Sequence, residues 1–134
     1  MSSKDLWFYF SQVSPYGKSS IAAEEESLNS SIFSIFNKRD HQKSIDILTE
    51  NNRALSVILS EVQISDLDVI VKQKFKVLID SMIGFNDSLI VICTGLLNKV
   101  NKLPYSFSQM SNDQRILDAY RQACLQAQNN LLLN

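Results

Sequence analysis

The chain has 134 residues, enough for one domain that buries about two-thirds of its unfolded surface without disulfides or metal ions. Its 45% hydrophobic and 20% charged residues exclude a disordered chain, and three glycines with two prolines are too few for the many turns of a β protein. Thirteen basic and fourteen acidic residues give a formal charge of −1, which argues against nucleic acid as a partner.

The segment 1–18 begins with an aromatic cluster, Leu6–Phe10, which is followed by the turn signal Pro15-Tyr16-Gly17. We predict a short strand or a helical turn here, followed by a loop. In an extended segment, alternation would place Trp7 and Tyr9 on the same side. Most of these aromatic side chains should pack against the rest of the domain, because they cannot all face water. One side of the segment would remain available to a partner.

A first helix is predicted from Ser19 to about Asn37. Its apolar residues recur at helical spacing, and Glu24-Glu25-Glu26 lies in its early turns, where the helix dipole favours anions. The polar residues 37–41 should form a connection.

A second helix is indicated by apolar residues that step by three and four from Ile45 to Val62, with Asn52 in the middle of this seam. The sequence Ser65-Asp66-Leu67-Asp68 then matches a capping box. A new helix would therefore start almost immediately, and the two helices should form an antiparallel hairpin.

The longest apolar pattern runs from Val71 to Leu96 in alternating steps of four and three, without a slip at Gly84. We predict one helix over about 66–101, roughly 50 Å long, in which the glycine costs about 1 kcal/mol relative to alanine. A second apolar stripe from Ile79 to Val100 indicates that the second half of this helix is surrounded by other elements.

Leu103-Pro104-Tyr105 should end the long helix, and Ser111-Asn112-Asp113-Gln114 offers a capping box for the last one. That helix leads to Leu131-Leu132-Leu133, which we expect to dock onto another surface. The sequence thus predicts one all-α domain over 1–134. It is an antiparallel bundle of about four helices around the central helix 66–101, with a short aromatic N-terminal segment.

The sequence lacks the residue combinations that catalysis, cofactor binding or metal binding require. His41 is the only histidine, and we expect it to be solvated at a helix start. Gly17-Lys18-Ser19-Ser20 resembles the end of a phosphate-binding loop, but Gln12 occupies the position of its first glycine. Cys93 and Cys124 are isolated within helical patterns and should be buried thiols. We expect no catalytic, cofactor or metal site.

The expected location is the cytoplasm. Isolated cysteines favour a reducing compartment, and the apolar run near the N-terminus is too short for the core of a secretory signal.

The leading functional hypothesis is a non-catalytic protein–protein interaction protein, namely an adaptor, a secretion or assembly chaperone, or an inhibitor of the immunity-protein type. We also expect self-association as a dimer, because we expect the apolar surface of the long helix to exceed what one short chain covers. The candidate partner-binding residues are Trp7, Tyr9, Tyr16, Tyr105, Leu132 and Leu133.

Asn52 and Asn86 interrupt two apolar seams, and we assign them as candidates for setting helix register, with a solvent-facing position as the alternative. A tight hairpin turning near Ser65 would place Asn52 level with Leu78. We therefore expect the two asparagines not to contact each other.

The alternative function is that of a membrane-active helical protein that inserts part of the apolar helix 79–100. Its uninterrupted apolar run is well short of the ~20 residues that a span needs, and Asp80 and Asp87 lie close by. An enzyme without a recognisable motif and a helical DNA-binding protein are further alternatives. The lysines are too dispersed to form a basic stripe.

Overall fold

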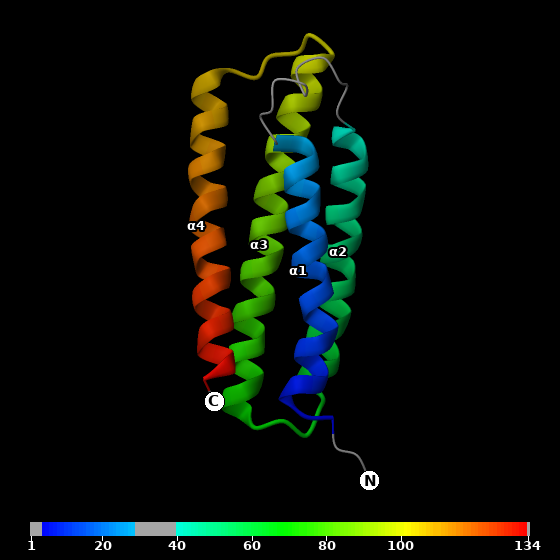
Figure 1. Ribbon diagram of the computed structural model, residues 1–134, viewed down its shortest axis with the longest axis vertical. Coiled ribbons are helices and arrows are strands. Elements are labelled where there is room, and N and C mark those ends of the chain that lie inside the picture. The colour runs from blue at the N-terminus through cyan, green and yellow to red at the C-terminus, as the bar shows by residue number, and fades with distance from the viewer. Residues whose placement is uncertain (1–3, 29–39, 134) are drawn as a thin grey trace.

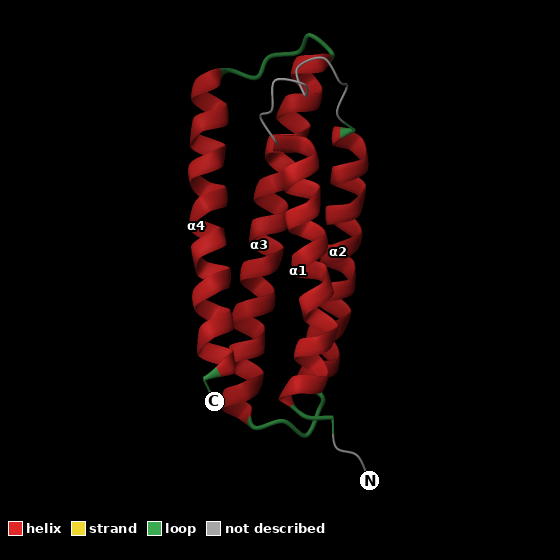
Figure 2. Cartoon of the chain, viewed as in Figure 1, coloured by secondary structure: helices red, strands yellow, loops and turns green. Residues whose placement is uncertain are grey.

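A computed structural model describes residues 4–28 and 40–133. It contains α1 (Leu6–Leu28), α2 (His41–Gln63), α3 (Val69–Val100) and α4 (Phe107–Leu132) (Figure 1). These two described ranges hold no β-strand (Figure 2). The predicted all-α class is confirmed.

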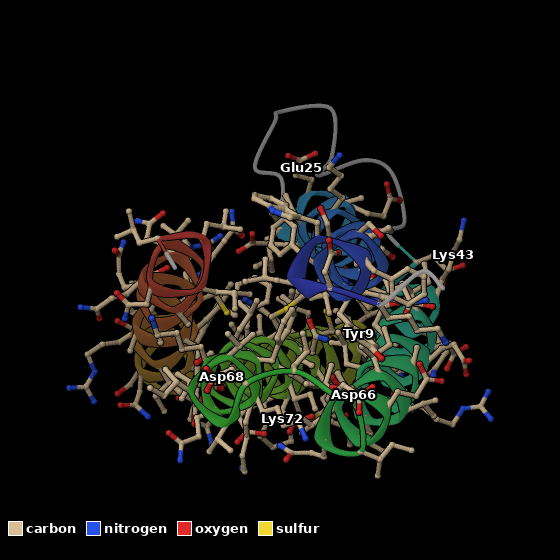
Figure 3. The ribbon with its side chains drawn as sticks, turned by 90° about the horizontal axis from the view of Figure 1, so that it is seen from below. Tyr9, Glu25, Lys43, Asp66, Asp68 and Lys72 are labelled. Carbon is tan, nitrogen blue, oxygen red and sulfur yellow. The ribbon has the colours of Figure 1, made fainter. Side chains whose placement is uncertain are left out.

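The four helices run alternately up and down, and α3 is the central one. It packs against α2 and α4 along most of its length and against α1 over a smaller area. By contrast, the backbone of α4 comes within packing distance of α3 alone and not of α1. Viewed from one end, α4 accordingly stands apart from α1 and α2 (Figure 3). The predicted antiparallel bundle around one long helix is confirmed.

The central helix begins and ends within a few residues of the predicted range 66–101. Asp68 is its N-cap, and the carboxylate accepts a hydrogen bond from the Ile70 backbone N–H at 3.0 Å. The predicted capping box of Ser65 with Asp68 is therefore wrong, because the Ser65 hydroxyl accepts from the Leu67 N–H instead.

The prediction of a strand or short turn and a loop over 1–18 is wrong, because α1 continues through Pro15. Tyr9 and Val13 are buried, and the same helix face continues with three small buried residues, Ser20, Ala23 and Ser27. This continuous face offsets the backbone hydrogen bond that proline removes. The helix predicted to start at Ser19 is the second half of α1, and its predicted extension to residue 37 lies outside the described residues.

The C-terminal half of α1, which is the upper half in Figure 1, is held against α2 by hydrogen bonds between small polar residues. The Ser27 hydroxyl donates to the Ser44 hydroxyl at 2.7 Å, and the Asn51 side-chain amide donates to the Ser20 hydroxyl at 3.1 Å. All four residues are buried. Burying such groups without partners would be costly, so the hydrogen bonds fix which faces of α1 and α2 meet.

The last helix begins earlier than predicted. Ser106 and Gln109 form a reciprocal capping box, in which the Ser106 hydroxyl accepts from the Gln109 N–H at 3.1 Å and the Gln109 side chain accepts from the Ser106 N–H at 2.8 Å. The predicted box at Ser111–Gln114 lies inside α4. Ser106 is the first residue after Pro104 that can cap a helix, so α4 begins there and Ser111 lies within the helix.

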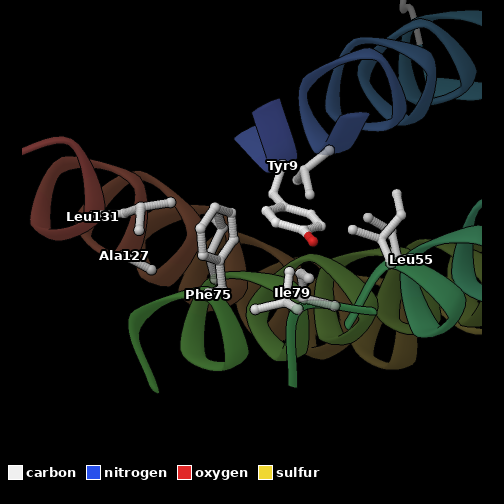
Figure 4. Packing of buried hydrophobic residues seen from close by; sticks show 10 residues of the cluster. Tyr9, Leu55, Phe75, Ile79, Ala127 and Leu131 are labelled. Atoms are coloured by element: carbon white, nitrogen blue, oxygen red, sulfur yellow. The ribbon is translucent and has the colours of Figure 1, made fainter. Parts of the chain in front are cut away.

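The hydrophobic core consists of two clusters, and all four helices contribute buried residues to each of them. In the lower cluster, the Tyr9 ring packs edge-on against Phe75 with ring centroids 6.3 Å apart, and Leu55 and Ile79 lie beside them (Figure 4). The upper cluster is built from α1, α2, α3 and α4, and it includes Leu48, Phe85, Leu89, Ile92 and Leu117.

Two glycines let tyrosine rings lie directly on the backbone of α3. A Cβ atom at Gly84 would stand 2.3 Å from Cε1 of Tyr120, and one at Gly95 would stand 2.4 Å from Cε1 of Tyr105. The Tyr105 ring is held in place because its hydroxyl donates to Asp113 at 2.9 Å. The glycine that interrupts the long apolar pattern thus has a packing role.

We predict that Gly95→Ala destabilises the protein by about 1–3 kcal/mol, because the new methyl group would overlap the Tyr105 ring. Helix propensity alone predicts the opposite sign, a gain of about 1 kcal/mol. Urea unfolding followed by circular dichroism would measure the difference. Thr94→Ala, at an exposed neighbouring position of α3, is the control and should be neutral or slightly stabilising. A more stable Gly95→Ala protein would contradict the close packing.

Candidate functional site

The main candidate site is an open groove between α1 and α4, which we call the α1–α4 groove. Its floor is formed by Leu78, Met82 and Phe85 of α3, and its walls carry Ile21 of α1 and Leu125 of α4. The cavity volume is about 140 Å³. A cavity of ~150 Å³ accommodates a benzene ring, so the groove has room for one large apolar side chain.

The groove has few charged side chains toward the C-terminal end of α4. Ile21 and Leu125 are both about half exposed at the rim. The sequence from Gln122 to the end of α4 contains no charged residue, and its polar side chains are all Gln or Asn. A partner that docks here would therefore lose little hydration of charged groups.

An ion pair spans the upper end of the groove and is a direct link between α1 and α4. The Arg121 guanidinium donates two hydrogen bonds to the Glu24 carboxylate, of which the bond from Nη1 to Oε1 measures 2.9 Å. It also lies over the Phe85 ring, 5.3 Å from the centroid. The hydrogen bond to Glu24 raises the pKa of Arg121, so this side chain stays charged. The pair closes the end of the groove that faces the α3–α4 connection.

The prediction that Asn52 and Asn86 do not contact each other is wrong. The buried Asn86 lies next to the floor of the groove, and its amide donates to the Asn52 side-chain oxygen at 2.9 Å. Asn52 in turn donates to Asp87 at 2.8 Å. The residue midway between the two asparagines is Val69, so the α2–α3 register is not centred on Ser65 as a tight turn would require. The pair bridges the two apolar seams, and its role in setting helix register stays a prediction.

The aromatic candidates from the sequence do not gather at one site. Tyr9 is a core residue and offers no surface to a partner, whereas Trp7 is exposed and packs edge-on against Phe10. Because this segment is helical, Trp7 and Tyr9 do not lie on the same side, as they would in an extended segment. Tyr16 is half-buried and lies on the α1–α2 side, away from the groove.

The remaining candidates lie at opposite ends of the bundle. Tyr105 is half-buried against Gly95 near the α3–α4 connection. Leu132 is half-buried at the end of α4, and Leu133 is exposed beyond it. Sequence reasoning missed Ile21 and Leu125, although both are apolar residues outside the buried faces of their helices.

The thiol in the groove is not suited to nucleophilic chemistry. Burial raises the pKa of Cys124 to about 11, so its thiol is protonated at neutral pH and reacts slowly. Burial likewise raises the pKa of Cys93.

Among residues 4–28 and 40–133, no group of three His, Cys, Asp or Glu side chains is arranged to hold a metal ion. His41 is buried at the first residue of α2, so the expectation that it is solvated is wrong.

By length and composition, α3 resembles a membrane-spanning helix, with a mean hydropathy of 1.6 over 18 residues. However, 44% of that window is buried inside the protein, and the core helix of a soluble protein has the same properties.

Comparison of the chain with protein-family models, curated proteins and solved structures returned no match.

We predict that Arg121→Met destabilises the protein by about 1–3 kcal/mol, because the Glu24 carboxylate, with 15% of its side chain exposed, would lose its partner. The methionine keeps the apolar contact with Phe85. Arg53→Met breaks the Glu50–Arg53 pair, whose side chains are 61% and 75% exposed, and should cost at most about 0.5 kcal/mol. Equal losses in thermal or urea unfolding would contradict a structural role for the groove ion pair.

We further predict energetic coupling between Asn52 and Asn86. Asn52→Ala should leave the Asn86 amide N–H without its acceptor, and Asn86→Ala should leave the Asn52 side-chain oxygen without its donor, whereas the double variant removes both groups. The coupling energy in a double-mutant cycle should be about 0.5–3 kcal/mol. Urea unfolding of the four proteins would measure it, and additive losses would show that the hydrogen bond contributes nothing.

Proposed function

We propose that this protein is a non-catalytic protein-interaction protein that binds an amphipathic helix of a partner in the α1–α4 groove. The observation that carries the proposal is that the backbone of α4 packs against α3 alone, which leaves an apolar groove open between α1 and α4 beside Leu78, Met82 and Phe85. Insertion of a helix into such a groove is a recurring mode of peptide recognition.

The shape of the groove defines the chemistry of the helix. A single large apolar side chain, such as leucine or phenylalanine, fits the cavity of about 140 Å³ between Met82 and Leu125. Further apolar residues three, four and seven positions away would cover the rims. The glutamines and asparagines of lower α4 favour uncharged polar residues along the edge of the helix.

The adaptor, chaperone and inhibitor roles expected from the sequence all use a binding surface of this kind. A chaperone or inhibitor would cover an amphipathic segment of its target, and an adaptor would hold one protein while contacting another. Cys93 and Cys124 are free thiols. Their state supports a reducing compartment, such as the cytoplasm, as the place where the groove acts.

A second copy of the chain is the other occupant that the groove could accept, which would give the expected dimer. Light scattering separates the two cases, because a dimer formed through the groove would dissociate when Leu125 is replaced by lysine. A membrane-active role would need α3 to leave the bundle. That helix contacts all three others and contributes to both core clusters, so the interaction role has the stronger support.

The experiment uses the uncharged dye Nile red as a probe of the groove, together with a displayed library of amphipathic helices selected for binding. We predict that selected helices carry a large apolar anchor and displace the dye. Leu125→Lys should weaken both dye and helix binding by roughly ten-fold or more, because it places a charge at the apolar rim.

Val57→Lys is the matched control, since Val57 on α2 is 55% exposed and Leu125 is 53% exposed. It should leave both affinities unchanged. The proposal would fail if the wild-type protein bound no dye and enriched no helices, or if the two lysine variants behaved alike.

A further inference from the structure

A second surface lies at the connection between α3 and α4, which we call the α3–α4 tip (residues 99–107). Figure 1 shows this connection at one extremity of the bundle, beyond the ends of α1 and α2. Three apolar side chains, Val100, Leu103 and Phe107, are exposed there, and Phe107 is 87% exposed. Apolar side chains that project from a convex turn are not explained by the core of the bundle.

The same tip carries two exposed lysines. Lys99 and Lys102 are both exposed, and neither forms an ion pair within the part of the chain that the structure describes. The sequence has no acidic residue between Asp87 and Asp113, and the Asp113 carboxylate accepts a hydrogen bond from Tyr105. The tip therefore offers two ammonium groups among apolar side chains.

The backbone holds this arrangement in a fixed geometry. The Leu103 N–H donates to the Asn98 carbonyl at 2.7 Å and the Lys102 N–H to the Lys99 carbonyl at 3.1 Å, which closes α3 with a Schellman motif. Lys102 has a φ of 62°, a conformation that normally selects glycine at this position. A lysine that occupies a glycine position at an energetic cost is consistent with a use for its charge.

We propose that the α3–α4 tip docks the intact bundle reversibly onto an anionic lipid bilayer. Leu103 and Phe107 would enter the boundary between headgroups and acyl chains, and Lys99 and Lys102 would lie at the anionic headgroups. A fluid bilayer accepts a convex apolar tip without a matching cavity, whereas an acidic protein surface would need one. This docking differs from insertion of α3, because every helix keeps its neighbours, and it is independent of the α1–α4 groove.

The test is co-sedimentation of the full chain with phosphatidylcholine vesicles, with and without about one-third phosphatidylserine. We expect binding only to the anionic vesicles, and weaker binding as salt increases. The double variant Lys99→Gln/Lys102→Gln should lose binding by roughly ten-fold or more. Phe107→Ser should lose binding on the order of ten-fold.

Ile64→Ser is the matched control, because Ile64 is also 87% exposed but lies at the opposite end of the bundle. It should bind as the wild type does, and circular dichroism would show that each variant keeps its helices. The proposal is overturned if the wild type does not bind anionic vesicles, even if it binds an acidic protein. It is also overturned if the tip variants bind as well as Ile64→Ser does.

The single tryptophan, Trp7, reports which end meets the bilayer, since it lies near the start of α1, at the end opposite the tip. Lipids brominated on their acyl chains quench tryptophan at contact. We expect the Trp7 fluorescence to be unchanged on binding. Quenching would overturn the proposal, because it would mean that the bundle docks by its other end or opens to insert a helix.

Discussion

The burial of α3 between α2 and α4 is the constraint on which the rest of the structure depends. Phe75, Leu78 and Ile79 belong to the lower core cluster and Phe85, Leu89 and Ile92 to the upper one, so α3 contributes several buried side chains to both. With α2 on one side and α4 on the other, α3 leaves only a narrow contact for α1. The bundle therefore stays open between α1 and α4, and the groove follows directly from how the central helix is shared.

The contact between α3 and α4 is close because α3 offers backbone where the tyrosines of the α4 side need space. Gly84 and Gly95 receive the rings of Tyr120 and Tyr105, and both rings would collide with any side chain there. The close contact with α3, together with the Arg121–Glu24 ion pair to α1, holds α4 in place without backbone packing against α1. The exposed, uncharged lower half of α4 is thus compatible with a stable fold while still providing a wall of the groove.

The strength of the apolar pattern decided how much of the fold could be predicted. The unbroken spacing from Val71 to Leu96 predicted α3 because every step of three or four in that pattern falls on a large apolar residue. The buried face of α1 was missed because its upper half presents the small residues Ser20, Ala23 and Ser27, and the two serines are buried through hydrogen bonds to α2 rather than through hydrophobicity. The groove could not be predicted, since no local pattern encodes that α1 and α4 stay apart.

The two surfaces proposed to act differ in shape and charge, and each matches a different kind of partner. The groove is concave, apolar and poor in charge, which suits a helix that brings its own shape. The tip is convex and basic, which suits a deformable anionic surface. Because the tip lies at one end of the long axis and the groove runs along the side, docking through the tip would hold the bundle upright on a membrane. The groove would then remain open to solvent, so the two kinds of binding would not compete for the same surface.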